Sequence, residues 1–347
     1  MVATVQDQLE AVLASGVPGA VVVAAGQGGR VEAAAGVANV ATGEPVTVGH
    51  RFRIGSVTKV FVAALALRLV ADGLLELDAP AEPFVEDVTI RQLLNHTSGL
   101  DDFDVGPEFW DSYRRDPARR WELDASDELR LVLEKPRLFP PGAGWAYHGS
   151  NYIALRLVIE DAVGTSLREA LRGRVFEPLG LEQTDLVEVP LSGECAHGYL
   201  ASDNPILPGG PGPVDVTGLD LPFHRAGGGI VSTPGEVSVL LREVLGGRFL
   251  PDTLRVEMLD AVDSDWEETD RYGLGIGEIT SLMGGPRSSC GGAWGHLGFS
   301  VGYVAIALSS EDGGRQVVIC ANGHPADDAE NSFFDAAGRL AWDLYCA

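Results

Sequence analysis

The chain has 347 residues, 45% of them hydrophobic and 7% aromatic, which is enough to bury a large core in one domain with an inserted lobe or in two domains. A formal net charge of −25 argues against a nucleic-acid partner, because phosphate binding needs clustered lysine and arginine. No run approaches the roughly 20 apolar residues needed to span a membrane, so no membrane partner is expected.

The first predicted elements are a helix, a hairpin and a second helix. Residues 7–15 have the pattern of a short amphipathic helix. Two apolar runs within 19–40 flank a Gly-Gly turn at 28–29 and predict a β-hairpin. Residues 57–73 predict a helix with buried apolar positions. The N-terminal segment has neither the basic nor the apolar region of a signal peptide, which favours a cytoplasmic location, or secretion if an export signal has been removed.

The middle of the chain predicts helices, and its end predicts strands. Residues 76–224 are expected to be mostly helical with long loops, and the breaker-rich stretch 205–216 to close this region. The apolar runs 302–310 and 315–323 flank a Glu-Asp-Gly-Gly turn and predict a second hairpin. A final helix is expected over 329–345.

This order of elements predicts an α/β (α+β) fold. Both chain ends, 1–75 and 225–347, would form an antiparallel sheet flanked by helices, and 76–224 would form an inserted, mostly helical lobe.

The cysteines and acidic residues give no sign of a metal or another cofactor. None of the cysteines forms a CxxC pair or has zinc-ligand spacing beside a histidine. The acidic run 101–104 is interpreted as a solvated loop. Scattered thiols suit a reducing compartment, but they are also compatible with one disulfide. The cysteines are Cys195, Cys290, Cys320 and Cys346.

The sharpest local feature is Gly-Ser-Val-Thr-Lys at a predicted helix start. Residues three apart share one face of a helix, so the Ser56 hydroxyl and the Lys59 ammonium can meet. A serine hydroxyl becomes a good nucleophile when a neighbouring group accepts its proton. The alternative is an N-cap serine with an unrelated surface lysine, and the short pattern alone is weak.

The surrounding sequence resembles the serine β-lactamase and DD-peptidase family, which includes class C β-lactamases, DD-carboxypeptidases and related esterases and transacylases. The resemblance implies a β-lactamase/transpeptidase-like fold and covers most of the chain from about residue 50 to 325. It is carried, in the family's order, by RFRIGSVTKVFVAALALRLVADGLLELD, TIRQLLNHTSGL, PGAGWAYHGSNYIALRLVIEDAVGTSL, VFEPLGLEQT, GGGIVSTPGE, RYGLGIG and WGHLGFSVGY.

The resemblance implies a role for each matching position. Ser56 would be acylated, and Lys59 would hold its proton balance and stabilise developing charge. Tyr147, in the helical lobe, would act as general base and return the proton to the leaving group. His296 would occupy the place of the lysine or histidine in the family's K-T-G element. Without the resemblance, Tyr147 and His296 would more often be structural residues.

Two further roles follow from the same resemblance. The backbone N–H groups of Ser56 and Phe299 would form an oxyanion hole. Gly298 would let the substrate backbone lie against its strand. His96, Asn151 and Tyr152 are interpreted as structural.

The substrate-binding positions depart from the family pattern. The family's Tyr-x-Asn element ends here in Gly149 rather than in the asparagine that binds the acyl-side amide, and His148 either enters the site or points into the core. Leu297 and Phe299 replace the hydroxyl residues that help bind a terminal carboxylate, and Gly277 replaces an assisting arginine. The loss of a hydrogen-bonded ionic anchor should cost a few kcal/mol in selecting such substrates.

The resulting hypothesis is a serine hydrolase or transacylase acting on an ester or amide that lacks a free terminal carboxylate. The acyl group would pass from a small-molecule donor to water, or to an amine or alcohol acceptor. The enzyme alternative is a D-alanyl-D-alanine carboxypeptidase or a class C-like β-lactamase. The non-enzyme alternative is a degenerate penicillin-binding sensor module.

Related secreted DD-carboxypeptidases carry a disulfide at the positions of Cys290 and Cys346. The resemblance therefore implies that these two residues lie close together, and their pairing leans towards export.

Overall fold

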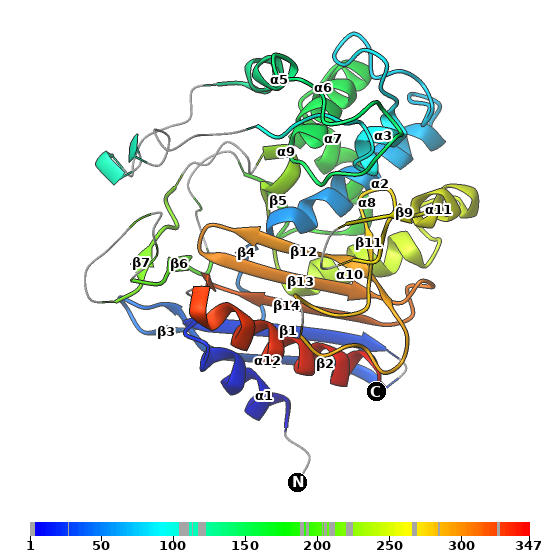
Figure 1. Ribbon diagram of the computed structural model, residues 1–347. Coiled ribbons are helices and arrows are strands. Elements are labelled where there is room, and N and C mark those ends of the chain that lie inside the picture. The colour runs from blue at the N-terminus through cyan, green and yellow to red at the C-terminus, as the bar shows by residue number, and fades with distance from the viewer. Residues whose placement is uncertain are drawn as a thin grey trace.

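A nine-stranded antiparallel sheet lies at the centre of the molecule, and both chain ends contribute to it (Figure 1). The strand order is β3-β2-β1-β14-β13-β12-β11-β10-β9. This computed structural model describes residues 4–26, 28–103, 111–112, 114–116, 123–187, 191, 194–202, 204, 207, 212–219, 225–265, 269–283, 285–324 and 327–347.

The strands of this sheet are β1 (Gly19–Gly26), β2 (Gly29–Asn39), β3 (Glu44–Pro45), β9 (Val262–Asp263), β10 (Arg271–Tyr272), β11 (Gly277–Ile279), β12 (Ala293–Ser300), β13 (Tyr303–Ser309) and β14 (Gln316–Ala321). Two small sheets accompany it, with the orders β4-β8-β5 and β15-β6-β7. Their strands are β4 (Phe52–Arg53), β5 (Asp185–Leu186), β6 (Tyr199–Leu200), β7 (Val214–Asp215), β8 (Ile230–Ser232) and β15 (Gly323–His324).

Helices cover both faces of the main sheet and form a lobe at one end of it (Figure 1). They are α1 (Val5–Leu13), η1 (Gly55–Val57), α2 (Thr58–Ala71), α3 (Ile90–Leu94), α5 (Ala125–Leu133), α6 (Ser150–Val163), α7 (Leu167–Leu171), η2 (Arg172–Phe176), α8 (Glu177–Leu179), α9 (Arg225–Gly228), α10 (Pro234–Leu245), α11 (Asp252–Leu259) and α12 (Asp327–Tyr345).

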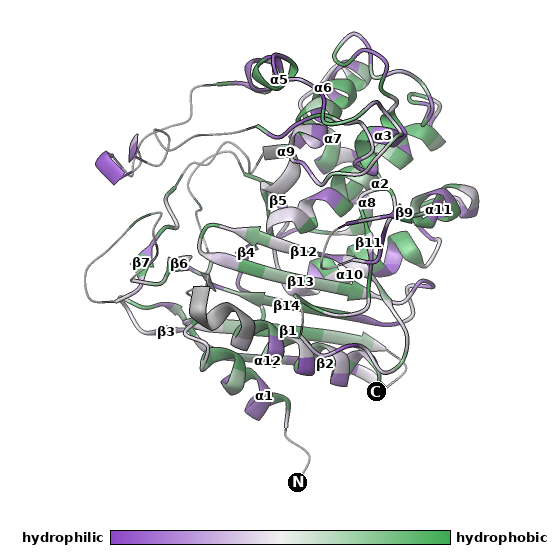
Figure 2. Ribbon diagram, viewed as in Figure 1, coloured by the Kyte–Doolittle hydropathy of each residue, from purple (hydrophilic) through white to green (hydrophobic). Residues whose placement is uncertain are grey.

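The central strands are buried on both faces, which explains their continuous apolar sequence (Figure 2). Because successive side chains of a strand point to opposite faces, β13 contributes side chains to two hydrophobic cores. Ile306 and Leu308 pack in the core beneath α1 and α12, whereas Ala305 and Ala307 pack in the core shared with α2 and α10. A helix on each face of the sheet is therefore necessary to keep these strands dry.

Helix α2 lies between the sheet and the helical lobe. Residues 58–67 are all buried, and the helix contacts η2, α7, α9, α11 and β12. Its apolar side chains point in every direction, as expected for a helix with no solvent-facing side. None of the described helices is both long enough and apolar enough to cross a membrane.

The predicted hairpins and the α/β (α+β) fold are observed, with differences at helix ends and in the lobe. Helix α1 begins two residues before the predicted 7–15, because the Thr4 side chain and Asp7 form a capping box there. The prediction of a mostly helical 76–224 is too broad: β5 pairs with β8, and β6 pairs with β15. These backbone hydrogen bonds attach the later part of the range to strands from outside it. The predicted closing loop, 205–216, lies largely outside the described residues.

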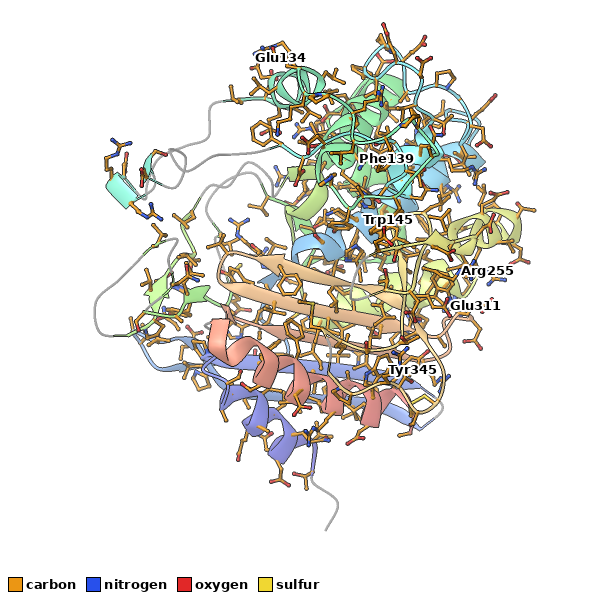
Figure 3. The ribbon with its side chains drawn as sticks, in the orientation of Figure 1. Glu134, Phe139, Trp145, Arg255, Glu311 and Tyr345 are labelled. Carbon is orange, nitrogen blue, oxygen red and sulfur yellow. A yellow bond between two sulfur atoms is a disulfide. The ribbon has the colours of Figure 1, made fainter. Side chains whose placement is uncertain are left out.

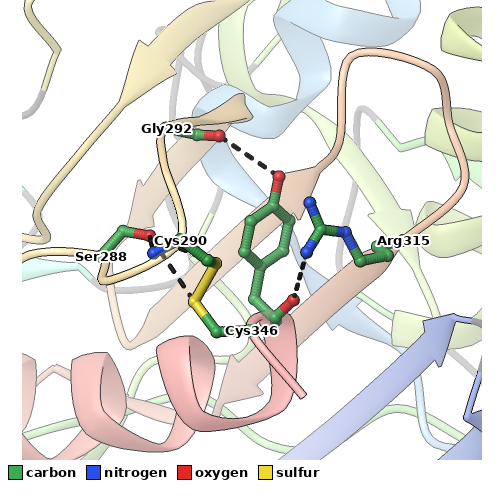
Figure 4. Close-up of a disulfide and its surroundings, with 6 residues drawn as sticks. Ser288, Cys290, Gly292, Arg315 and Cys346 are labelled. Carbon is green, nitrogen blue, oxygen red and sulfur yellow. Dashed lines mark hydrogen bonds between the residues drawn. A yellow bond between two sulfur atoms is a disulfide. The ribbon is translucent and has the colours of Figure 1, made fainter.

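A disulfide joins Cys290 to Cys346, with the two Cα atoms 5.6 Å apart, as the sequence resemblance implies (Figure 4). It links the segment before β12 to the end of α12. Tyr345 lies beside it and donates its hydroxyl to the Gly292 carbonyl, at 3.3 Å. Arg315 donates to the Tyr345 carbonyl and lies 4.7 Å from the centre of its ring. The C-terminal helix is thus tied to the sheet by covalent and polar contacts.

Candidate active site

Ser56 lies where η1 packs against strand β12. Gly55, with φ of +49°, makes this close approach possible, because a Cβ there would lie 2.4 Å from the Phe299 carbonyl oxygen and 2.6 Å from its nitrogen. Gly298 is equally constrained, since its Cβ would lie 1.9 Å from the Ile54 carbonyl oxygen. Ser56 itself stays partly exposed, although the residues on both sides of it are buried. The turn therefore presents one hydroxyl at the surface of a packed interior.

Lys59 is in the first turn of α2 and reaches back to this hydroxyl. Its Nζ donates to Ser56 Oγ at 3.0 Å and to the Gly227 carbonyl of α9 at 2.8 Å. The same nitrogen lies 4.9 Å from the centre of the Tyr147 ring and 5.4 Å from that of Tyr152. Helical spacing and tertiary packing together therefore aim the amine at the serine.

Burial lowers the pKa of Lys59, which is only 3% exposed. Desolvation lowers its pKa to about 7, and the negative charge of Asp102 opposes part of this shift. Near neutral pH a large fraction of the amine is consequently uncharged and can accept a proton from a hydroxyl.

His296, on β12, is fully buried and meets two tyrosines. Its Nδ1 lies against the Leu297 carbonyl, which can only accept, so Nδ1 carries the proton and Nε2 is an acceptor. Tyr272 donates its hydroxyl to Nε2 at 2.9 Å, and the Tyr147 hydroxyl lies 3.5 Å from the same nitrogen. Burial, followed by the nearby Lys59, lowers the pKa of His296 to about 3. The imidazole is therefore neutral at physiological pH and orients hydroxyl groups without adding charge.

The segment that carries Tyr147 is held by His96. His96 has φ of +64°, and its carbonyl accepts the Ala146 N–H at 3.1 Å. Its Nδ1 accepts the His148 N–H at 3.4 Å and lies 3.1 Å from the amide nitrogen of Asn151. The His96 and Tyr147 rings are 4.5 Å apart. His96 is therefore structural, as expected, and its contacts hold the segment that positions Tyr147.

Aromatic side chains complete this interior. Trp145 lies between the helical lobe and the sheet, and its ring is 5.8 Å from that of Tyr272 (Figure 3). Tyr152 donates to the Leu94 carbonyl at 3.2 Å, and burial raises the pKa of both Tyr152 and Tyr272 well above the ordinary value. We call Ser56, Lys59, Tyr147 and His296, with these surrounding rings, the site interior.

A charged rim lies beside the interior at the start of α6. His148 Nδ1 is 3.8 Å from the Asp102 carboxylate, and Ser150 donates to the same carboxylate at 3.3 Å. The His148 side chain is 23% exposed and that of Asp102 is 52% exposed. The partly exposed His148 side chain therefore does not point into the core. We call Asp102 and His148 the site rim.

Comparison with known proteins identifies the chain. The beta-lactamase family model matches residues 3–339. The chain belongs to the beta-lactamase family. It is 28% identical over 328 residues to esterase EstB of Burkholderia gladioli, which covers 80% of this chain and 81% of that one.

Two solved structures extend this likeness to the three-dimensional level. A D-stereospecific amidohydrolase from Streptomyces sp. is 28% identical with a TM-score of 0.80, covering 94% of this chain and 96% of that chain. The D-amino acid amidase of Ochrobactrum anthropi SV3 is 25% identical with a TM-score of 0.83, covering 98% and 96%. This member of the beta-lactamase family is thus an enzyme of the serine hydrolase class.

Some of the predicted substrate-binding residues lie beside the site, and others are packed in a core away from it. His148 belongs to the rim and Gly149 lies beside Asp102, but Leu297 is 1% exposed and packs in the core under α12. Phe299 packs against the same core, with its ring 5.8 Å from that of Phe334. Neither side chain faces the site, because successive residues of a strand alternate between faces and both lie on the opposite face of β12 from His296.

The two remaining glycines serve packing. A Cβ on Gly298 would collide with the turn before Ser56, so the protein's own backbone already requires glycine there. Gly277 is buried in β11, where a Cβ would lie 2.4 Å from the Thr269 methyl group. The contact of Gly298 with a substrate backbone stays a prediction, and packing gives a separate reason for glycine at both positions.

Sequence reasoning did not find Tyr272, Trp145 or the contribution of Asp102. The RYGLGIG block contained Tyr272, but no local pattern shows that its hydroxyl reaches a histidine on another strand. Asp102 was grouped with a solvated acidic run. Among the described residues, no group of three or more His, Cys, Asp or Glu side chains could hold a metal ion.

Proposed function

We propose that this enzyme hydrolyses small esters or amides through an acyl-enzyme at Ser56, and that its substrates lack a free terminal carboxylate. The observation that carries the proposal is the 3.0 Å contact between Lys59 Nζ and Ser56 Oγ, made by an amine whose pKa is lowered to about 7. A serine beside such a base is an activated nucleophile.

In the proposed mechanism, neutral Lys59 accepts the Ser56 hydroxyl proton while Oγ attacks the substrate carbonyl carbon. The backbone N–H groups of Ser56 and Phe299 would stabilise the resulting oxyanion, an effect of about 3 kcal/mol for each donor. The Tyr147 hydroxyl would protonate the leaving group and recover its proton from Lys59. The family resemblance gives the general-base role to Tyr147; we propose Lys59 for this role instead, because its Nζ lies 3.0 Å from Ser56 Oγ.

Deacylation would follow the same path with a second nucleophile. Water, or an amine or alcohol, would lose its proton to neutral Lys59 and attack the acyl carbon. Lys59 would then return a proton to Ser56 as the acyl group leaves. Neutral His296 would orient the Tyr147 hydroxyl throughout, as its acceptor nitrogen lies 3.5 Å away.

Electrostatics supports the choice of substrate. Leu297 and Phe299 face the core under α12, so selection against a carboxylate depends on the charges beside the site. Asp102 places negative charge within electrostatic reach of Lys59. A substrate carboxylate placed beside Asp102 would therefore meet repulsion. Known relatives named as an esterase and as amidases agree with this substrate class.

The test compares turnover of a D-Ala-D-Ala peptide with that of its methyl ester, in the wild-type enzyme and in Ser56→Ala. We expect the ester to be turned over at least as well as the acid, and the variant to be inactive, with a Ser56-linked acyl adduct visible by intact mass. Strong preference for the free acid would instead indicate a carboxypeptidase.

A second measurement separates turnover from sensing. Hydrolysis that continues after the first equivalent of product supports an enzyme, whereas a single burst without turnover would indicate a covalent receptor. Adding an amine such as glycinamide then tests the acceptor: formation of the amide product in competition with acid shows acyl transfer.

A further inference from the structure

We infer that the Asp102 carboxylate binds a protonated amine in the acyl part of the substrate. This inference rests on the proposed function, because it names the substrate feature that the same site selects.

The carboxylate occupies a gap that Gly149 leaves open. A Cβ built on Gly149 would lie 3.6 Å from Asp102 Oδ1, so a side chain at this position would point at the acid. Ser150 Oγ donates to the same oxygen at 3.3 Å, and the Phe103 N–H donates to it at 3.0 Å. The first turn of α6 and the following loop thus hold the carboxylate beside the segment that carries Tyr147.

The group is charged and accessible. Burial raises the pKa of Asp102, but hydrogen bonding and attraction to His148, with backbone N–H groups, more than offset this and leave it below its ordinary value. An ionised carboxylate only accepts hydrogen bonds, so it selects donors, and a cation best of all. With its side chain 52% exposed, it can meet a ligand.

The position favours the acyl part over the leaving group. Proton delivery to a leaving group requires the Tyr147 hydroxyl, and that hydroxyl faces His296 on β12. Asp102 instead contacts the residues that follow Tyr147, at the start of α6. A substrate with its leaving group towards β12 therefore directs the remainder of its acyl part to the rim.

The test compares alanine methyl ester, which has a free amine, with N-acetylalanine methyl ester, using both enantiomers. We expect wild-type kcat/KM to favour the free amine by about 30-fold or more, and Asp102→Asn to reduce this preference to about threefold. Asp101→Asn is the matched control, since it removes the same charge one residue away, where the carboxylate lies 3.9 Å from Lys135. This control should keep the wild-type preference.

Equal preferences in Asp102→Asn and Asp101→Asn, or wild-type preference for the acetylated ester, would overturn the inference. If Ser56 were still required for turnover in that case, the proposed function would stand alone. If neither ester is turned over, binding of both esters to Ser56→Ala is measured by calorimetry. Tighter binding of the free-amine ester that is lost in Asp102→Asn supports the inference. Equal binding of the two esters overturns it.

Discussion

The site interior and the site rim differ in burial and in the way each handles charge. In the interior, burial lowers the pKa of Lys59 to about 7 and that of His296 to about 3, so both bases can exist uncharged. At the rim, Asp102 is half exposed and keeps its charge beside His148. The comparison suggests that desolvation supplies reactivity in the interior, whereas retained charge supplies selectivity at the rim.

The largest expected effect is the loss of the interior base. Lys59→Met should lower kcat/KM by about 10³-fold or more, because the nucleophile loses its proton acceptor. The depressed pKa also costs stability: the unfolded state binds the Lys59 proton between about pH 7 and the ordinary lysine value, so wild-type stability rises with pH across this window. Any stability advantage of Lys59→Met at pH 7 should therefore shrink as the pH approaches 10, measured by thermal unfolding.

The pH dependence of activity tests the same group in the unmodified protein. If neutral Lys59 is required, kcat/KM should fall about tenfold for each pH unit below about 7. His296 stays neutral over this range, as its pKa is about 3, and should add no second slope. A flat profile down to pH 5, with the protein still folded by circular dichroism, would contradict the assignment of Lys59 as the base.

A smaller effect is expected at the edge of the interior. Tyr272→Phe removes the hydroxyl that donates to His296 Nε2 at 2.9 Å and leaves a buried acceptor without that donor. We expect about 1–3 kcal/mol of destabilisation and a loss of about tenfold in kcat. Tyr345→Phe is the control, because its hydroxyl donates to the Gly292 carbonyl beside the disulfide. Similar losses of activity in both variants would argue against a specific effect on His296.

The smallest effect on catalysis should come from the opposite face of β12. Leu297→Ala should cost about 2–5 kcal/mol of stability by opening a cavity under α12 while leaving substrate preference unchanged. Leu308→Ala, in the same core on β13, should behave alike. A changed ester-to-amide ratio in Leu297→Ala alone would return this residue to the substrate site.

The sequence by itself determined the elements whose signals are local. Apolar runs and the turn residues between them predicted both hairpins, because these signals depend on neighbouring residues. The three-residue spacing of Ser56 and Lys59 predicted their contact, which needs only a helical turn. Family resemblance supplied the pairing of Cys290 with Cys346, whose separation of 56 residues no local rule could bridge.

Only the tertiary structure decided which face each strand residue uses and which distant groups meet. Leu297 was expected in the site, yet the pleat of β12 sends it to the opposite core from its neighbour His296. Tyr272 reaches His296 and Asp102 reaches the start of α6 through contacts between segments far apart in the chain. Burial, which sets the pKa of Lys59, is likewise a property of the packed molecule, because desolvation depends on every element that covers the amine.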